Sequence, residues 1–175
     1  KVYITLNIVV KNNELSQLID YLHKYSFITP DQSAYLKNHS TQTSLHRVVD
    51  DWLENMNNGL VTAVCFLDIQ KCYDTINHEL LCGKLRNYGI RHNELKWFES
   101  YLKNRQQRVA CNKNVSNTID VTMGVPQGSV LGPILFLLYA NDLGNFISGA
   151  TLNCYADDTV LYVSAETAEE AVNIL

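Results

Sequence analysis

The 175-residue sequence has few of the features that mark secreted, membrane-spanning or multi-domain chains. It contains only 3 prolines and 8 glycines, and no stretch is rich in either, so no linker is indicated. Its five cysteines include no C-x-x-C pair, and their odd number argues against a zinc site and a complete disulfide framework. The longest apolar run, Ile134–Ala140, is too short to cross a bilayer, and no signal peptide is visible. The sequence therefore predicts an intracellular protein that is neither secreted nor held in a membrane.

Charged residues are also sparse. They make up 18% of the sequence against 46% hydrophobic residues, a balance typical of an ordinary globular domain. The formal net charge of −4 argues against a small basic module that binds nucleic acid through its charge alone. An enzyme that gathers acidic residues at a metal site remains compatible with this composition. Because the first residue is Lys1 rather than Met, we expect a piece of a longer chain.

Hydrophobic periodicity predicts an α+β fold rather than strict alternation of strands and helices. Helices are expected over residues 15–25, 41–56, 77–88, 95–102, 134–139 and 166–175. Strands are expected over residues 60–69, 106–112, 117–123, 152–156 and 159–163. Ser40 or Thr41 is expected to cap the second helix and Asn77 the third. The apolar strand over residues 60–69 is expected to be buried on both faces, and a polar turn is expected around residues 113–116.

Three aspartates lie at the ends of these predicted strands. Asp68 closes the apolar segment "LVTAVCFLDI", and Asp157 and Asp158 are expected at the turn of the last hairpin. Taken singly, each has an ordinary explanation, because acidic residues are common in solvated turns and at exposed strand ends. Two strands of one sheet, however, can place Asp68 beside Asp157.

Carboxylates gathered in this way repel one another unless a proton or a cation neutralises them. Oxygen ligands favour a hard cation, and few protein ligands with room for water favour Mg²⁺ over a caged Ca²⁺. A pair of such ions can activate an attacking hydroxyl and stabilise a leaving pyrophosphate. The residues alone leave two hypotheses open, a solvated hairpin turn and a two-metal site.

Three sequence blocks favour the second hypothesis. They are "FLDIQKCYDTINHELL" (Phe66–Leu81), "GVPQGSVLGPILFLLYANDL" (Gly124–Leu143) and "YADDTVLY" (Tyr155–Tyr162). In this order they resemble the reverse transcriptase of non-LTR (LINE-type) retrotransposons, particularly the jockey-like branch. Residues 27–41 and 95–109 are similar to the same family, so the likeness covers nearly the whole chain. One departure is Ala34-Tyr35-Leu36, where the family usually has a triplet like Gly-Phe-Arg that supplies an arginine.

The resemblance implies the architecture of a right-hand polymerase, truncated here. A palm of antiparallel sheet with helices on one face is expected roughly over residues 60–76 and 132–175. Part of the fingers is expected roughly over residues 1–59 and 77–131, which makes residues 1–175 a single partial domain. Lys1–Leu6 begins too late to contain the basic strands of the fingers, and the thumb and the endonuclease are expected to be absent. The fragment alone is therefore expected to be inactive or very weak.

The implied activity is that of an RNA-directed DNA polymerase, a nucleotidyltransferase that adds deoxynucleotides to a primer 3′-hydroxyl. Its expected partners are an RNA template, a DNA primer or target and dNTPs, and its expected cofactors are two Mg²⁺ ions, with Mn²⁺ as a substitute. The family works as a ribonucleoprotein in the cytoplasm, the nucleus or both. No oligomeric state is implied.

Residue roles also follow from the resemblance. Asp68 and Asp157 would bind both metals with Asp158 alongside, and the backbone carbonyl of Ile69 would be a further metal ligand. Tyr73 matches the aromatic residue that excludes a ribose 2′-hydroxyl. Gln127 and Gly128 match the loop that binds the incoming dNTP in the family. Asp74 is expected to organise a turn and His78 to lie near a helix N-terminus.

Two alternatives stay open. The first is a decayed or domesticated remnant of the same domain that binds RNA without catalysis. The intact Asp68, Asp157 and Asp158 argue against such decay, whereas the truncation and Leu36 argue for it. The second is a related RNA-templated RNA polymerase or an intron maturase, against which Tyr73 and the Tyr-Ala-Asp-Asp sequence favour DNA synthesis.

Overall fold

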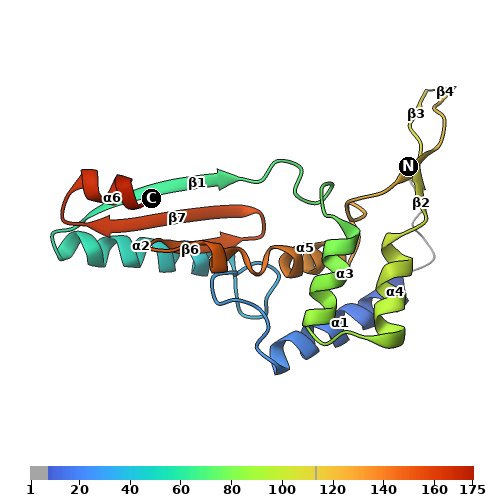
Figure 1. The fold of residues 1–175 in the computed structure, drawn as a ribbon, viewed down its shortest axis with the longest axis horizontal. Coiled ribbons are helices and arrows are strands. Elements are labelled where there is room, and N and C mark those ends of the chain that lie inside the picture. The colour runs from blue at the N-terminus through green and yellow to red at the C-terminus, as the bar shows by residue number, and fades with distance from the viewer. Residues whose placement is uncertain (1–7, 113) are drawn as a thin grey trace. The chain divides into compact units, whose positions relative to one another are not determined.

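The computed structural model describes residues 8–112 and 114–175, and within them the α+β architecture is confirmed (Figure 1). The backbone contacts divide the chain into two compact units. The first contains residues 71–139 together with the N-terminal segment up to Tyr21. The second contains residues 22–70 and 140–175. Among the described residues, no helix has the length and apolar character needed to cross a membrane.

The second unit is built on a three-stranded antiparallel sheet with the order β1-β7-β6 (Figure 1). Its strands are β1 (Val61–Asp68), β6 (Thr151–Tyr155) and β7 (Asp158–Ala165). Helices α2 (Thr41–Asn57) and α6 (Ala168–Ile174) pack against these strands. A 3-10 helix, η1 (Leu143–Phe146), precedes β6. This sheet with its helices is the expected palm architecture.

Polar contacts fix α2 against the sheet. The Tyr162 hydroxyl on β7 donates a hydrogen bond to the Asp51 carboxylate on α2, and the Tyr162 ring meets the Trp52 ring edge-on at 6.0 Å. Burial raises the pKa of the Tyr162 phenol above its usual value, and the bond to Asp51 raises it further. The Asn153 amide donates to the buried Ser44 hydroxyl at 2.9 Å. The Tyr162 hydroxyl and the Asn153 amide nitrogen thus make hydrogen bonds that would be costly to leave unmade in a buried interface, whereas the buried Asn153 Oδ1 has no partner among the described residues.

The first unit contains α3 (His78–Asn87), α4 (His92–Leu102) and most of α5 (Gly132–Ala140). α1 (Ile8–Lys24) begins in this unit, and the Tyr21 hydroxyl donates to the Tyr88 carbonyl at 2.7 Å. The core is aliphatic, and its fully buried side chains include Leu81, Leu85, Leu102, Leu131, Leu135 and Leu138. Asn77 caps α3 as predicted, because its side chain accepts from the amides of Glu79 and Leu80. In the second unit, Ser40 rather than Thr41 caps α2.

The predicted hairpin in the first unit is divided into two short pairs of strands. β2 (Arg105–Gln107) pairs with β5 (Ile119–Val121), and β3 (Ala110–Cys111) pairs with β4 (Asn114–Val115). The prediction of a turn at residues 113–116 was wrong in part. Residues 114 and 115 belong to β4, and residue 113 lies outside the described residues. The prediction for Lys1–Leu6 also falls outside them.

One prediction about burial was wrong. β1 is not buried on both faces, since Phe66 is 73% exposed and Leu67 is 41% exposed. The physical reason is that β1 is an edge strand and pairs only with β7 among the described strands. The apolar stripe of α2 is also only partly covered, because Val48 is buried whereas Leu45 and Met56 are exposed.

Candidate active site

The last hairpin of the second unit carries two of the three aspartates. β6 and β7 are joined by the two-residue turn of Ala156 and Asp157, and Tyr155 lies opposite Asp158. Asp157 is therefore in the turn as predicted, but Asp158 is the first residue of β7 and is not in the turn. Ala156 has a φ of +58°, a left-handed conformation that costs a residue with a Cβ about 1–2 kcal/mol. Neighbouring groups must therefore hold this turn.

The sheet register places Asp68 directly opposite Asp158. Directly opposed residues on antiparallel neighbours point to the same face of the sheet, with Cβ atoms about 4.5–5.5 Å apart. Both side chains are exposed at the end of the paired strands. The sequence prediction placed Asp157 beside Asp68, whereas the register gives that position to Asp158. Two exposed carboxylates on one face can attract a cation.

The fit of these residues to Mg²⁺ depends on the number and type of donors. In the part of the chain that the structure describes, no group of three or more His, Cys, Asp or Glu side chains could hold a metal ion. Mg²⁺ does not require such a cage, because it is usually bound by one or two carboxylates together with water and substrate phosphates. The opposed pair Asp68 and Asp158, with Asp157 next in sequence, supplies carboxylate oxygens of the right type. Ile69 directly follows Asp68 and is exposed.

Tyr73, the predicted selector of the sugar, lies in the first unit. Its ring packs on the Phe136 ring of α5, with the centroids 5.0 Å apart. The Tyr73 carbonyl accepts from the Val125 amide at 2.8 Å, and the Ile76 carbonyl accepts from the Gly124 amide at 2.7 Å. The segment that carries Tyr73 is thus bound along its backbone to the segment that begins the Gly124–Leu143 block.

Gln127 and Gly128 lie in the same unit as Tyr73. The Gln127 amide nitrogen lies 3.2 Å from each oxygen of the Asp74 carboxylate and donates to it. Both Gln127 and Gly128 are exposed, and Gly128 has a φ of +71°, which favours glycine. His78 is the first residue of α3, as expected, and its Nε2 lies 2.8 Å from the Gly124 carbonyl. The structure therefore joins Tyr73, Asp74 and Gln127 to one connected set of loops.

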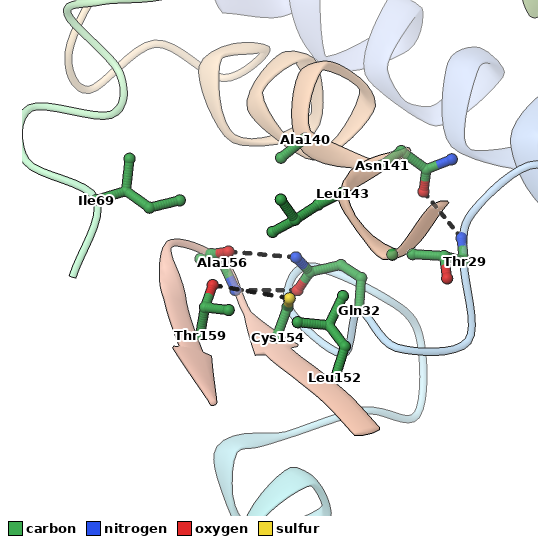
Figure 2. Close-up of a pocket in the computed structure, with 11 residues that line it drawn as sticks. Thr29, Gln32, Ile69, Ala140, Asn141, Leu143, Leu152, Cys154, Ala156 and Thr159 are labelled. Atoms are coloured by element: carbon green, nitrogen blue, oxygen red, sulfur yellow. Dashed lines mark hydrogen bonds between the residues drawn. The ribbon is translucent and has the colours of Figure 1, made fainter. Parts of the chain in front are cut away.

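Sequence reasoning missed two amide side chains around a small cavity beside the hairpin of β6 and β7 (Figure 2). Gln32 bonds to both backbone groups of Ala156. Asn141 accepts from the Thr29 amide at 2.9 Å and donates to the Phe27 carbonyl at 2.8 Å. The cavity volume is about 10 Å³, room for about one water molecule, so it is not a nucleotide pocket. Both residues lie in segments that carry the family resemblance, but nothing in their spacing indicates these contacts.

Solved structures define the class of fold. Apo telomerase from Candida Tropicalis, truncated from the C-terminal domain, is similar over 98% of this chain and 36% of that one, with a TM-score of 0.65. Telomerase from the same organism in complex with the TWJ fragment of telomeric RNA is similar over 93% and 29%, with a TM-score of 0.64. The sequence identity is 16% in both comparisons, so they show the fold alone. The shared fold, helices packed on an antiparallel sheet, agrees with the truncated palm that was expected.

Sequence comparison gives the family. The profile described as "Reverse transcriptase (RNA-dependent DNA polymerase)" matches residues 6–175, and the chain belongs to this family. The RNA-directed DNA polymerase from mobile element jockey of Drosophila melanogaster is 32% identical over 78% of this chain. The probable RNA-directed DNA polymerase from transposon X-element of the same fly is 30% identical over 83% of it. The chain spans 16% of the length of each relative. The resemblance to reverse transcriptases of non-LTR retrotransposons is confirmed.

Proposed function

We propose that this chain forms the catalytic part of an RNA-directed DNA polymerase of a non-LTR retrotransposon. The observation that carries the proposal is the direct opposition of Asp68 and Asp158 in the sheet register. Each aspartate comes from a different family-like block, and the two blocks are distant in sequence. Their meeting is what a site for hard cations requires, and a solvated turn alone does not require it.

In the proposed reaction, a primer 3′-hydroxyl attacks the α-phosphate of a dNTP and releases pyrophosphate. Asp68, Asp157 and Asp158 would hold two Mg²⁺ ions, with the Ile69 carbonyl as a further ligand. When bound, Mg²⁺ lowers the pKa of the attacking hydroxyl and neutralises the charge of the leaving group. The exposed Asp68 and Asp158 place negative charge at one end of the sheet. This division of roles suits phosphoryl transfer, where positioning and charge neutralisation do most of the catalysis.

The first unit would select the nucleotide. The Tyr73 ring is held on Phe136, so it would resist displacement and exclude a 2′-hydroxyl by steric clash. The bond from the Gln127 amide nitrogen to Asp74 leaves the Gln127 carbonyl oxygen as the group that can accept from a substrate. Gly128 would let a nucleic-acid strand approach the backbone closely.

The proposal also assigns the subdomains, the partners, the metal ion and the cellular setting. The palm would comprise roughly residues 60–76 and 132–175, and the fingers roughly residues 1–59 and 77–131. The partners would be an RNA template, a DNA primer or target and dNTPs. Mn²⁺ would substitute for Mg²⁺, and the protein would act within a ribonucleoprotein inside the cell.

Primer extension by the full-length protein tests the proposal, because this chain spans only 16% of the relatives named above. The assay uses an RNA template, a DNA primer, dNTPs and Mg²⁺. We expect extension by the natural protein and a loss of at least about 100-fold in Asp157→Asn. The matched control is Asp20→Asn, which removes an exposed aspartate of α1 and should leave extension unchanged. RNA binding without any Mg²⁺-dependent extension by the natural protein would contradict the proposal and favour the non-catalytic remnant.

A further inference from the structure

We infer that Gln32 is a positioning residue that sets the backbone of the turn from which Asp157 projects. This inference rests on the proposed function, because it gives Asp157 a role at the metal site. It adds a residue that lies outside the carboxylates and outside the nucleotide-binding loops. Gln32 acts through Ala156, the residue that precedes Asp157.

The Gln32 side chain uses both ends of its amide on this turn. Its Oε1 accepts a hydrogen bond from the Ala156 amide at 2.9 Å, and its Nε2 donates one to the Ala156 carbonyl at 3.2 Å (Figure 2). The same Oε1 also accepts from the Ala34 amide at 2.9 Å. Gln32 is 5% exposed and Ala156 is 8% exposed, so bulk water has little access to these bonds. Removing the amide would leave buried backbone groups without partners.

The backbone around Gln32 is itself fixed to the sheet. The Cys154 amide donates to the Asp31 carbonyl at 2.7 Å, and the Ser33 amide donates to the Cys154 carbonyl at 3.0 Å. These two bonds form a parallel bridge between Gln32 and Cys154, which continues the sheet beyond β6. The amide of Gln32 is therefore presented to the turn from a backbone segment that is hydrogen-bonded to β6.

The geometry of the turn explains why such a support matters. Ala156 has a φ of +58°, a conformation that alanine rarely adopts without help from its surroundings. The Ala156 carbonyl belongs to the same planar peptide group as the Asp157 amide. Because Gln32 holds that carbonyl by a hydrogen bond, it fixes the orientation of the peptide group that leads into Asp157. On the C-terminal side of Asp157, the Thr159 hydroxyl donates to the Asp157 carbonyl at 3.3 Å.

The affinity for a metal ion distinguishes a positioning role of Gln32 from a merely structural one. It is measured in a complex that cannot react. The full-length protein is assembled with an RNA template, a 3′-deoxy-terminated DNA primer and a matching dNTP, so that no bond can form. Mn²⁺ is then added, and the bound ion is measured from the loss of the free-ion signal in electron paramagnetic resonance. Gln32→Met, which keeps the size but loses all three hydrogen bonds, should weaken Mn²⁺ binding about 10-fold.

Two further variants make the result specific. Gln32→Glu keeps the oxygen that accepts from Ala34 and Ala156, but it sets a buried carboxylate oxygen against the Ala156 carbonyl oxygen. It should therefore weaken Mn²⁺ binding at least as much as Gln32→Met does. Ser44→Ala removes a buried hydrogen bond to Asn153 on the same sheet, away from the turn. It should lower the thermal stability without changing Mn²⁺ affinity. Binding as tight as in the natural protein in both Gln32 variants would overturn the inference.

The Asp157→Asn variant separates this inference from the proposed function. If Asp157→Asn weakens Mn²⁺ binding and the Gln32 variants do not, only the positioning role is overturned. If Asp157→Asn binds Mn²⁺ as the natural protein does, Asp157 is not a metal ligand and both statements are overturned. Weakened binding in Asp157→Asn and in both Gln32 variants, with Ser44→Ala unchanged, is the expected result.

Discussion

Asp68 and Asp158 lie directly opposite each other on the antiparallel strands β1 and β7, and both side chains are exposed. Like charges at opposed positions of one sheet face repel each other and destabilise the fold. The arrangement is therefore unfavourable in the protein alone and becomes favourable when a cation binds. Such a pair lowers the stability of the metal-free protein and serves the binding of a cation. Folding stability and metal-dependent activity can be measured separately.

We predict that Asp158→Asn stabilises the metal-free protein while it abolishes Mg²⁺-dependent extension. Removing one of two opposed charges should raise the free energy of unfolding by about 0.2–1 kcal/mol. The gain should shrink in high salt, which screens exposed charges. Urea unfolding in the presence of EDTA measures the effect, with Asp20→Asn as the control. A loss of stability in Asp158→Asn would show that repulsion across this pair is not significant.

Gly124 is predicted to be the least replaceable glycine of the first unit. A Cβ at this position would lie 2.7 Å from the Asp74 carbonyl oxygen and 2.9 Å from the Asp74 Cα. Gly124→Ala should therefore destabilise the protein by about 1–3 kcal/mol more than Gly59→Ala does. Gly59 is the matched control because it has a similar φ, +78° against +81°, and an added Cβ there would meet no atom of the described residues within 4 Å. Thermal unfolding of the two variants checks this, and equal losses would show that the Asp74 backbone moves aside at little cost.

Tyr73→Ala is predicted to admit ribonucleotides. Loss of the ring should reduce the discrimination of dNTP over rNTP by about 10- to 100-fold. Tyr73→Phe keeps the ring against Phe136 and should keep the selectivity. Primer extension with each nucleotide type gives the ratio of kcat/KM values. Unchanged sugar selectivity in Tyr73→Ala would remove Tyr73 from this role.

The hydrogen bond from Tyr162 to Asp51 predicts a loss of stability at high pH. The folded state raises the pKa of the Tyr162 phenol above the model-compound value of 10.0, chiefly through burial. A raised pKa means that the contribution is complete below pH 10 and is lost as the pH rises above it. Tyr162→Phe should lack this part of the pH dependence and should lower stability near pH 8 by about 1–3 kcal/mol. Urea unfolding between pH 8 and pH 11 measures both effects.

The control for this prediction is Tyr25→Phe, which alters a tyrosine that is 52% exposed. It should retain the high-pH loss of stability seen in the natural protein. If Tyr162→Phe and the natural protein lose stability in parallel above pH 10, the contact with Asp51 does not couple folding to pH.

Local features of the fold could be predicted because local sequence causes them. Ser40 and Asn77 cap their helices through side chains that reach amides two or three residues away. The hairpin that carries Asp157 follows from two apolar segments separated by a short polar one. The family blocks likewise lie in continuous sequence. The roles carried over onto Tyr73, Gln127 and Gly128 stay predictions.

Contacts between distant segments could not be predicted in this way. The composition of residues 60–69 indicated a strand buried on both faces, but whether a strand lies at an edge depends on the other strands. The pairing of Asp68 with Asp158 depends on which two residues form the turn. A shift of one residue in that register would move every side chain of the strand to the other face.

The sequence by itself determined the family, the type of most elements and the identity of the three carboxylates, because these depend on nearest neighbours and on continuous blocks. The tertiary structure decided which carboxylates meet and what holds them. Gln32 supports the turn of Ala156 from 124 positions away, through backbone groups that every residue possesses. Such contacts leave no pattern in a single sequence, since the partner of Gln32 is a peptide group and not a side chain.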